Sequence, residues 1–138
     1  MVAWIAGAWN APWKCLVNHD GIMDTRTMAL SSDIPSFSEY ETGGFVWDRN
    51  QDYERFNPIT KAGDWKVPML VVHGGKDFRV PLSQGMAAFT AAQRKGVPSR
   101  FLYYPDENHW VLKPQNSVAW YANVEAWMRR WLKAPAKP

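Results

Sequence analysis

The sequence predicts an α/β fold with about three parallel strands flanked by helices. Three short apolar runs alternate with longer stretches in which apolar residues recur at helical spacing, an alternation typical of parallel sheets covered by helices. The middle run, Val67–Gly74, is apolar almost throughout, as strands buried on both faces are. With 138 residues and a hydrophobic content of 46%, the chain is long enough for one domain with a sizeable core.

The first half of the chain predicts one helix, one strand and a less regular excursion. Met1–Trp9 is apolar at helical spacing and precedes the turn sequence NAPW. Lys14–Asn18 is a short, mostly apolar run that predicts the first strand. The stretch Ser31–Ala62, with its Gly43–Gly44 pair and scattered aromatic residues, predicts a loop excursion with one short helix near Asp52–Phe56.

The second half predicts two strands and two helices in alternation. Val67–Gly74, bounded by proline and glycine, is the second strand, although a buried helix segment shows the same pattern. Ser99–Pro105 is the third strand. Leu82–Lys95, between them, follows a proline and ends at a glycine, the usual boundaries of a helix. Asn116–Leu132 carries an apolar stripe at intervals of three and four residues, which predicts an amphipathic helix.

Composition narrows the class of protein. The formal net charge of +3 is spread along the chain, so neither a nucleic-acid surface nor a membrane surface is indicated. Cys15 is the single cysteine, which excludes an internal disulfide. The apolar start of the chain is too short to span a bilayer and lacks the positive residues of a signal peptide. Because the chain opens inside an apolar helical pattern, it is expected to be part of a longer protein. Its localisation therefore cannot be predicted from this sequence.

Two titratable residues follow the second and third predicted strands. Asp77 lies in HGGKD and His109 in PDENH. Ligands of parallel sheets bind beyond the carboxyl ends of the strands, so these two side chains are expected to meet at one edge of the sheet. A carboxylate that accepts a hydrogen bond from an imidazole fixes its tautomer and stabilises the imidazolium. Histidine titrates near neutrality, so the pair is the candidate acid and base of a catalytic site.

A resemblance to a known family rests on the same residues. The sequence from LVVHGGKDFRVP to MRRWL resembles the C-terminal end of prolyl oligopeptidase-family serine peptidases, above all dipeptidyl-peptidase and acylaminoacyl-peptidase-like enzymes. KCLVNHDGIMDTR and ETGGFVWD resemble that family too, so the likeness covers nearly the whole chain. It implies an α/β-hydrolase fold, of which residues 1–132 form a partial domain with about three of the eight strands, and residues 133–138 form a tail. It also implies that Asp77 and His109 are the acid and base of a Ser-Asp-His triad.

The nucleophile of that triad is not found in the sequence. The family carries its serine in a G-x-S-x-G elbow, and no such motif occurs. The nearest match, PLSQG at residues 81–85, has a proline where the first glycine belongs and follows the wrong strand. By the resemblance, Met1 falls a few residues downstream of the missing serine. The oxyanion hole and the N-terminal propeller of the family are expected to be missing as well.

Other interpretations of these residues stay open. Asp77 is alternatively a solvated turn residue, and His109 a loop histidine stacked on Trp110. His73 is expected to hydrogen-bond backbone at a strand end. Arg79 either pairs with a carboxylate near the site or forms a surface salt bridge. Three further residues, the small Cys15 and the aromatic pair Trp127 and Trp131, are expected in the core.

A metal site is the less favoured alternative. Six residues near the predicted strand ends are candidate metal ligands, but none of their spacings matches a tight zinc motif such as H-E-x-x-H. They are His19, Asp20, His73, Asp77, Glu107 and His109. His19 and Asp20 are instead expected to shape the loop after the first strand, at the rim of the site. We therefore predict no metal and no cofactor.

Two functions follow as hypotheses. In the first, the chain is the C-terminal catalytic segment of a serine peptidase that hydrolyses short peptides, and it is inactive without the segment that carries the serine. In the second, it is a non-catalytic module that self-associates through an exposed sheet edge. Either hypothesis makes a homo-oligomer an expected partner, and the first adds a peptide substrate.

Overall fold

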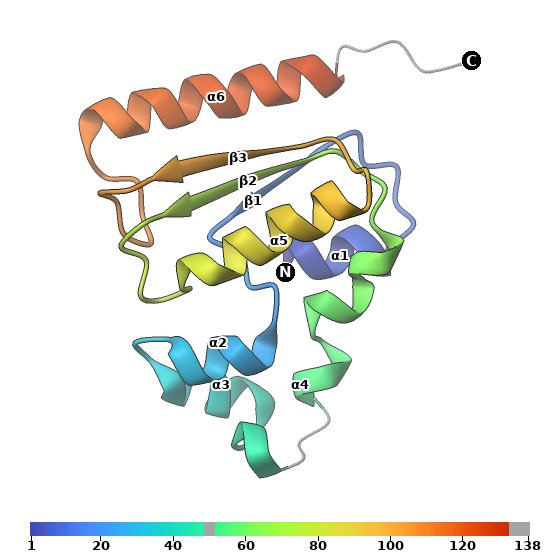
Figure 1. The fold of residues 1–138 in the computed structure, drawn as a ribbon, viewed down its shortest axis with the longest axis vertical. Helices are drawn as coiled ribbons and strands as arrows, with labels where there is room; N and C mark the ends of the chain where they lie inside the picture. The colour runs from blue at the N-terminus through green and yellow to red at the C-terminus, as the bar shows by residue number, and fades with distance from the viewer. Residues whose placement is uncertain (49–51, 133–138) are drawn as a thin grey trace.

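A three-stranded parallel sheet organises the molecule. The computed structural model describes residues 1–48 and 52–132. The strands β1 (Leu16–His19), β2 (Met69–Gly74) and β3 (Ser99–Tyr104) lie in the order β1-β2-β3 and run in the same direction (Figure 1). β2 is buried at all six positions because a neighbouring strand flanks it on each side and helices cover both faces. The three strands overlap those predicted, and the parallel sheet is confirmed.

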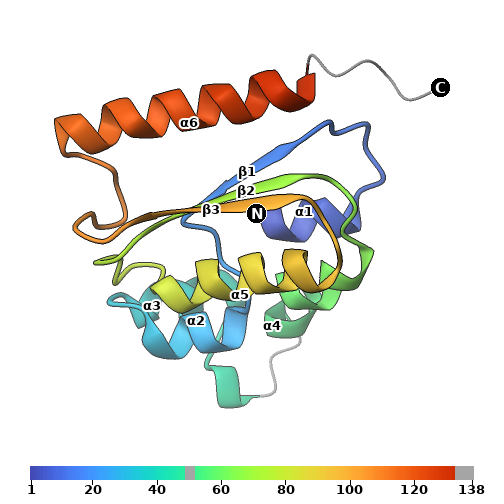
Figure 2. The ribbon, with the colours of Figure 1, turned by 45° about the horizontal axis from the view of Figure 1, so that its top comes forward.

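Helices cover the two faces of the sheet. α6 (Pro114–Leu132) lies along one face, whereas α1 (Val2–Ala8) and α5 (Leu82–Arg94) lie on the other (Figure 2). Each face has its own apolar core. Met69 and Val71 of β2 point toward α1 and α5, whereas Leu70 and Val72 point toward α6. This alternation is the two-residue period of a strand, and it explains why the predicted run had to be continuously apolar.

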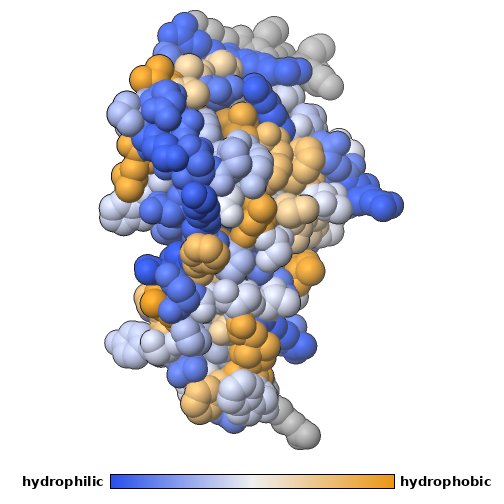
Figure 3. Space-filling model, turned by 60° about the vertical axis from the view of Figure 1, so that its left-hand side comes forward, coloured by the Kyte–Doolittle hydropathy of each residue, from blue (hydrophilic) through white to orange (hydrophobic). Residues whose placement is uncertain are grey.

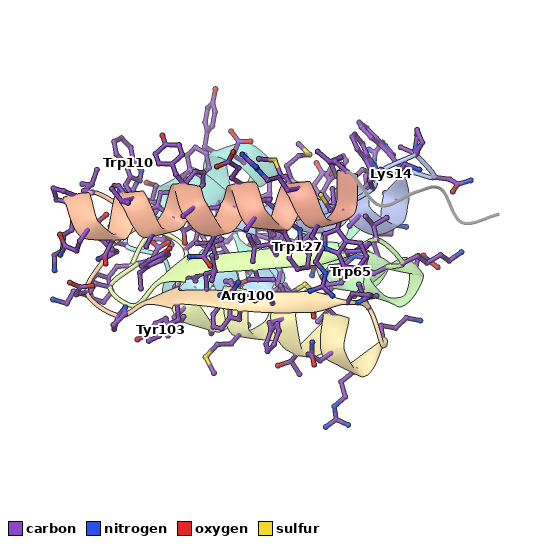
Figure 4. The ribbon with its side chains drawn as sticks, turned by 90° about the horizontal axis from the view of Figure 1, so that it is seen from above. Lys14, Trp65, Arg100, Tyr103, Trp110 and Trp127 are labelled. Carbon is purple, nitrogen blue, oxygen red and sulfur yellow. The ribbon has the colours of Figure 1, made fainter. Side chains whose placement is uncertain are left out.

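The helix α6 rests on the sheet through aromatic side chains. Val124 and Trp127 are buried against β2 and β3, and Trp131 packs against the same cluster. Figure 4, seen from above, shows Trp127 between α6 and the sheet, with Trp110 and Lys14 toward opposite ends of the helix. The core positions predicted for Trp127 and Trp131 are therefore confirmed. Cys15, half-buried, packs against this cluster too.

The segment between β1 and β2 is more helical than predicted. It contains α2 (Thr25–Ser31), α3 (Pro35–Thr42), the 3₁₀ turn η1 (Val46–Asp48), α4 (Asp52–Arg55) and the 3₁₀ helix η2 (Pro58–Asp64). α2 begins at Asp24, whose carboxylate accepts hydrogen bonds from the N–H groups of Arg26 and Thr27. The predicted irregular excursion was thus wrong for α3, whereas the short helix expected near Asp52–Phe56 is α4.

α3 was missed because its signals are local. Pro35 occupies its first turn, and Gly43 ends it in the left-handed conformation with φ of 79°, which glycine adopts without steric cost. None of its residues is buried. A helix without a buried face has no apolar stripe, so periodicity could not reveal it.

The carboxyl ends of the three strands lie on the left-hand side of Figure 1, where the loops after β1, β2 and β3 meet. Figure 3 shows this side of the molecule, where apolar groups interrupt a largely hydrophilic surface. The exposed side chains with large apolar groups in these loops and on α6 include Phe78, Trp110, Leu112 and Tyr121. No helix in the described ranges combines the length and apolar character needed to cross a bilayer. The predicted tail, residues 133–138, lies outside the described residues.

Candidate active site

Asp77 is fixed in the turn between β2 and α5. Its side chain is buried, and Oδ1 accepts hydrogen bonds from the backbone N–H groups of Arg79 at 2.9 Å and Val80 at 2.8 Å. An aspartate that bonds the backbone two and three residues ahead forms a compact turn at the end of a strand. Since both bonds engage Oδ1, the other carboxylate oxygen is available to a partner.

That partner is His109, from the loop after β3. His109 Nδ1 lies 2.8 Å from Asp77 Oδ2. The carboxylate accepts, so Nδ1 carries the proton and Nε2 of the neutral ring keeps its lone pair. The imidazole is about a third exposed, at 34%, while the Asp77 carboxylate is fully buried at 0%. An imidazole that is partly exposed and held by a buried carboxylate has the arrangement that proton transfer to and from a reacting group requires.

The loop that carries His109 is held by Glu107, two residues earlier. Glu107 is buried, and its carboxylate accepts hydrogen bonds from the N–H groups of Leu112 and Lys113, both at 3.0 Å, and from Asn116 Nδ2 at 2.6 Å. Burial raises the pKa of Glu107, but the bonds from Asn116 and the backbone outweigh it and hold the pKa below its usual value. The sequence singled out Glu107 only as a metal ligand. In the structure it instead closes the loop onto the start of α6.

Gly74 allows the two loops to approach each other. A Cβ at Gly74 would lie 2.1 Å from the carbonyl oxygen of Asn108. The Glu107 carbonyl accepts a hydrogen bond of 2.8 Å from the N–H of Lys76, the residue next to Asp77. Backbone contact without intervening side chains therefore sets the distance between Asp77 and His109, which explains the glycine at position 74.

A second carboxylate and two further histidines lie behind the Asp77–His109 pair. His73 is fully buried and its Nε2 lies 2.7 Å from the Val80 carbonyl oxygen, so the predicted backbone hydrogen bond is confirmed. Asp20, at the end of β1, is buried too, and its carboxylate lies within 4.0 Å of His109 Nδ1. His19 lies 3.0 Å from the same carboxylate. His19 and Asp20 both line a cavity beside His109, the rim position that the sequence allowed, although the Asp20 side chain is buried.

The predicted metal ligands converge only in part. Donor atoms of Asp20, His73 and Asp77 lie within 4.8 Å of one another. However, His73 Nε2 is engaged by a carbonyl, and both oxygens of Asp77 are engaged by N–H groups of the protein. These contacts favour a hydrogen-bonded acid–base cluster over a metal site. The carboxylate of Glu107 faces the start of α6 instead.

The structure shows the positions of Arg79, whose partner the sequence left open, and of Ser83, which the sequence rejected as the nucleophile. Arg79 forms a surface ion pair with Asp33, whose Oδ1 lies 2.8 Å from Nε. Ser83 of the PLSQG sequence is exposed in the first turn of α5, so it does not stand on a strand-to-helix elbow.

Two cavities flank His109. One, of about 390 Å³, is lined by His19, Asp20 and a set of side chains that reach to α6, including Ser117, Trp120 and Tyr121. The other, of about 380 Å³, lies on the side of Asp77 and includes Asp33, Phe78 and Arg79. His109 and Trp110 line both. The imidazole is therefore accessible from two directions.

Comparison with known proteins gives the family. A sequence profile of the "Prolyl oligopeptidase family" matches residues 1–135. The chain belongs to the prolyl oligopeptidase family. Two similar relatives are called dipeptidyl-peptidase 5. One, from Schizosaccharomyces pombe, is 40% identical over 134 residues, which is 96% of this chain and 20% of the relative. The other, from Porphyromonas endodontalis, is 40% identical over 136 residues, which again cover 96% of this chain and 20% of the relative.

Solved structures of acylaminoacyl peptidases share the fold. The Pyrococcus horikoshii acylaminoacyl peptidase superposes with a TM-score of 0.87 at 22% identity. The superposition covers 99% of this chain and 23% of the Pyrococcus horikoshii protein. A Mycobacterium tuberculosis puromycin-hydrolyzing peptidase gives 0.77 at 23% identity, over 86% of this chain and 18% of that protein. This prolyl oligopeptidase-family chain is thus a portion of an α/β-hydrolase fold, and it spans about a fifth of the length of the curated relatives it matches.

Proposed function

We propose that the chain is the part of a serine peptidase catalytic domain that supplies the acid and the base of the triad. The observation that carries the proposal is the 2.8 Å contact between Asp77 Oδ2 and His109 Nδ1 at the carboxyl edge of a parallel sheet. The nucleophilic serine and the oxyanion hole come from a segment outside this sequence, which contains no G-x-S-x-G. The chain by itself is therefore inactive.

The reaction follows from the two side chains. His109 Nε2 accepts the proton of the serine hydroxyl while the serine oxygen attacks the peptide carbonyl carbon. Asp77 stabilises the resulting imidazolium through Nδ1–H. The imidazolium then gives the proton to the leaving amine, and the C–N bond breaks to leave an acyl-serine. Water then attacks the acyl carbon and gives a proton to Nε2. The ester C–O bond breaks, the carboxylic acid product leaves, and the imidazolium returns the proton to the serine oxygen.

The substrate class is taken from the relatives. Those 40% identical to this chain are named dipeptidyl-peptidases, so we propose that the complete enzyme hydrolyses short peptides, releasing dipeptides. The second hypothesis, a non-catalytic module that self-associates, is supported by the position of β1 at the edge of the described sheet. It accounts for the edge but not for the buried Asp77–His109 pair.

A fusion tests the proposal. The chain replaces the matching C-terminal region of the Schizosaccharomyces pombe dipeptidyl-peptidase 5, to which it is 40% identical over 134 residues. We expect the fusion to hydrolyse a dipeptide p-nitroanilide, and the chain alone to remain at background. His109→Ala in the fusion should lower kcat/KM by about three orders of magnitude or more, since the triad acts as a unit.

Ser83→Ala is the matched control, because Ser83 lies in the only elbow-like sequence. It should leave the fusion fully active. Turnover by the chain alone that a serine-directed phosphonate abolishes, or an active His109→Ala fusion, would refute the proposal.

A further inference from the structure

The carboxyl ends of β1 and β2 hold a group of buried polar atoms without hydrogen-bond partners. Among the described residues, Asn18 Nδ2, His19 Nε2, Asp20 Oδ2 and His73 Nδ1 lack a hydrogen bond of good geometry, although His19 Nε2 and Asp20 Oδ2 lie 3.0 Å apart, within ion-pair distance. Buried polar atoms are normally paired, because an unpaired one costs free energy. Four such atoms on adjacent strand ends, beside the base of the proposed triad, indicate that this place is built for something other than stability.

Asp20 has the most unusual conformation of these residues. Its φ is 47°, and it is the only residue other than glycine with a positive φ in the described ranges. The left-handed region disfavours side chains, so a residue held there is held by its surroundings, and such residues gather at functional sites. Gly21 follows directly and could have taken the turn. A buried aspartate in this position therefore needs a reason.

The surroundings of the Asp20 carboxylate give that reason. Its one hydrogen bond comes from the N–H of Gly74, at the long distance of 3.4 Å. Three imidazoles surround it: His19 Nε2 at 3.0 Å and His109 Nδ1 at 4.0 Å from Oδ2, and His73 Nδ1 at 3.7 Å from Oδ1. A buried carboxylate with so few donors favours positive charge on neighbouring rings.

His109 is the neighbour on which this charge has chemical value. His73 is fully buried and its Nε2 is engaged by Val80, whereas His19 stacks on Trp120 with ring centroids 5.6 Å apart. The same nitrogen of His109 faces two carboxylates, Asp77 at 2.8 Å and Asp20 at 4.0 Å. Asp77 takes the hydrogen bond, and Asp20 adds a second negative charge within Coulombic range.

We propose that Asp20 is a second carboxylate behind His109, a positioning residue that stabilises the protonated imidazole and keeps its Nδ1–H directed toward the buried acids. The inference rests on the proposed function, since it gives His109 the role of base. It extends that function because an acid–base pair becomes a three-residue unit, with one carboxylate from the end of β1 and one from the turn after β2.

The test measures the imidazole directly and needs no turnover. The chain has 3 histidines, so their C2 protons can be followed separately by NMR over pH. Replacing Asp20→Asn removes a negative charge that favours the protonated ring, so the midpoint of the His109 titration should move to lower pH. Asp77→Asn should lower the same midpoint. Other charged groups near the ring are Lys76, Arg79 and Asp33 on the Asp77 side, and they are unchanged in both variants.

Asp20→Gly guards against a trivial failure to fold. Glycine adopts a φ of 47° without strain, so this variant should keep the thermal stability of the unmodified chain while the His109 midpoint falls as in Asp20→Asn. In the active fusion, Asp20→Asn should move the acidic limb of the kcat/KM profile to lower pH, whereas a purely structural role would reduce the rate equally at every pH.

The outcomes separate the two proposals. If Asp77→Asn lowers the midpoint of His109 and the Asp20 variants leave it unchanged, Asp20 has no role and the proposed function stands. If neither carboxylate affects the midpoint, the acid–base pair itself is refuted, and the inference about Asp20 falls with it.

Discussion

At the residue scale, one carboxylate decides whether His109 is in place. Glu107 receives hydrogen bonds from Leu112, Lys113 and Asn116, and its carbonyl receives the N–H of Lys76. It thereby joins the loop after β3 to the start of α6 and to the turn that carries Asp77. The Glu107 side chain makes the contacts to Leu112, Lys113 and Asn116, whereas its backbone carbonyl makes the contact to Lys76.

Glu107→Gln tests this role through pH. The pKa of Glu107 is lowered in the folded state by its hydrogen bonds, after burial has been overcome. Its contribution to stability is therefore present above the unfolded glutamate pKa of about 4.3 and is lost as pH falls through the lower folded value. We expect the variant to be less stable than the unmodified chain at pH 7 in urea unfolding, with the difference shrinking toward pH 3.

Asp106→Asn is the matched control on the same loop. Asp106 forms an exposed ion pair with Lys113, and it accepts a hydrogen bond of 3.1 Å from Asn116 Nδ2 but none from the backbone of Leu112 or Lys113. Exposed pairs contribute little to stability. A loss from Asp106→Asn as large as that from Glu107→Gln would show that any carboxylate of this loop serves equally well.

At the element scale, the close approach of α5 to β2 holds His73 in place beneath the candidate site. A Cβ at Gly85 would lie 2.4 Å from Nδ1 of His73 and 2.9 Å from its Cγ. His73 cannot move aside, because it is fully buried and its Nε2 contacts the Val80 carbonyl. The glycine of the PLSQG sequence is thus a packing residue of α5.

Gly85→Ala should therefore destabilise the chain by about 1–3 kcal/mol, the usual cost of overpacking a core, even though alanine is the better helix former. Gly63→Ala is the control, since a Cβ at Gly63 meets nothing within 4 Å. It should change the free energy of unfolding by less than about 0.5 kcal/mol. Chemical denaturation measures both, and equal stabilities would contradict the packing argument.

At the scale of the whole molecule, the described sheet ends at β1. The N–H of Leu16 bonds Pro68 and that of Asp20 bonds Val72, so even-numbered residues of β1 face β2. The backbone groups of Val17 and His19 then point to the other side, where no strand lies within the described residues. An edge of this kind invites pairing with another strand.

Hydrogen exchange tests what covers this edge. At low concentration the amides of Val17 and His19 should exchange at least about tenfold faster than those of Leu16 and Asp20, which are hydrogen-bonded to β2. In the active fusion all four should be protected, since under the proposed function the upstream part of the fusion supplies the neighbouring strand. Protection in the chain alone that grows with concentration would instead favour the self-associating module.

The sequence by itself determined the parallel sheet, its three strands, the helices on its faces and the two loops with Asp77 and His109. Those features follow from short-range patterns, since burial on both faces of β2 requires a continuous apolar run. It did not determine α3, which has no buried face to leave a periodic signal.

Only the tertiary structure decided the rest of the site. Gly74 and Asp20 matter through contacts between segments far apart in the chain, such as the 4.0 Å between Asp20 and His109, and Glu107 matters through hydrogen bonds within its own loop and to α6. A periodic pattern reports which residues are buried, but it does not report which loops the strand order brings together. The second carboxylate was therefore visible in the sequence only as an aspartate before a glycine, and its place beneath the imidazole came from the pairing of β1 with β2.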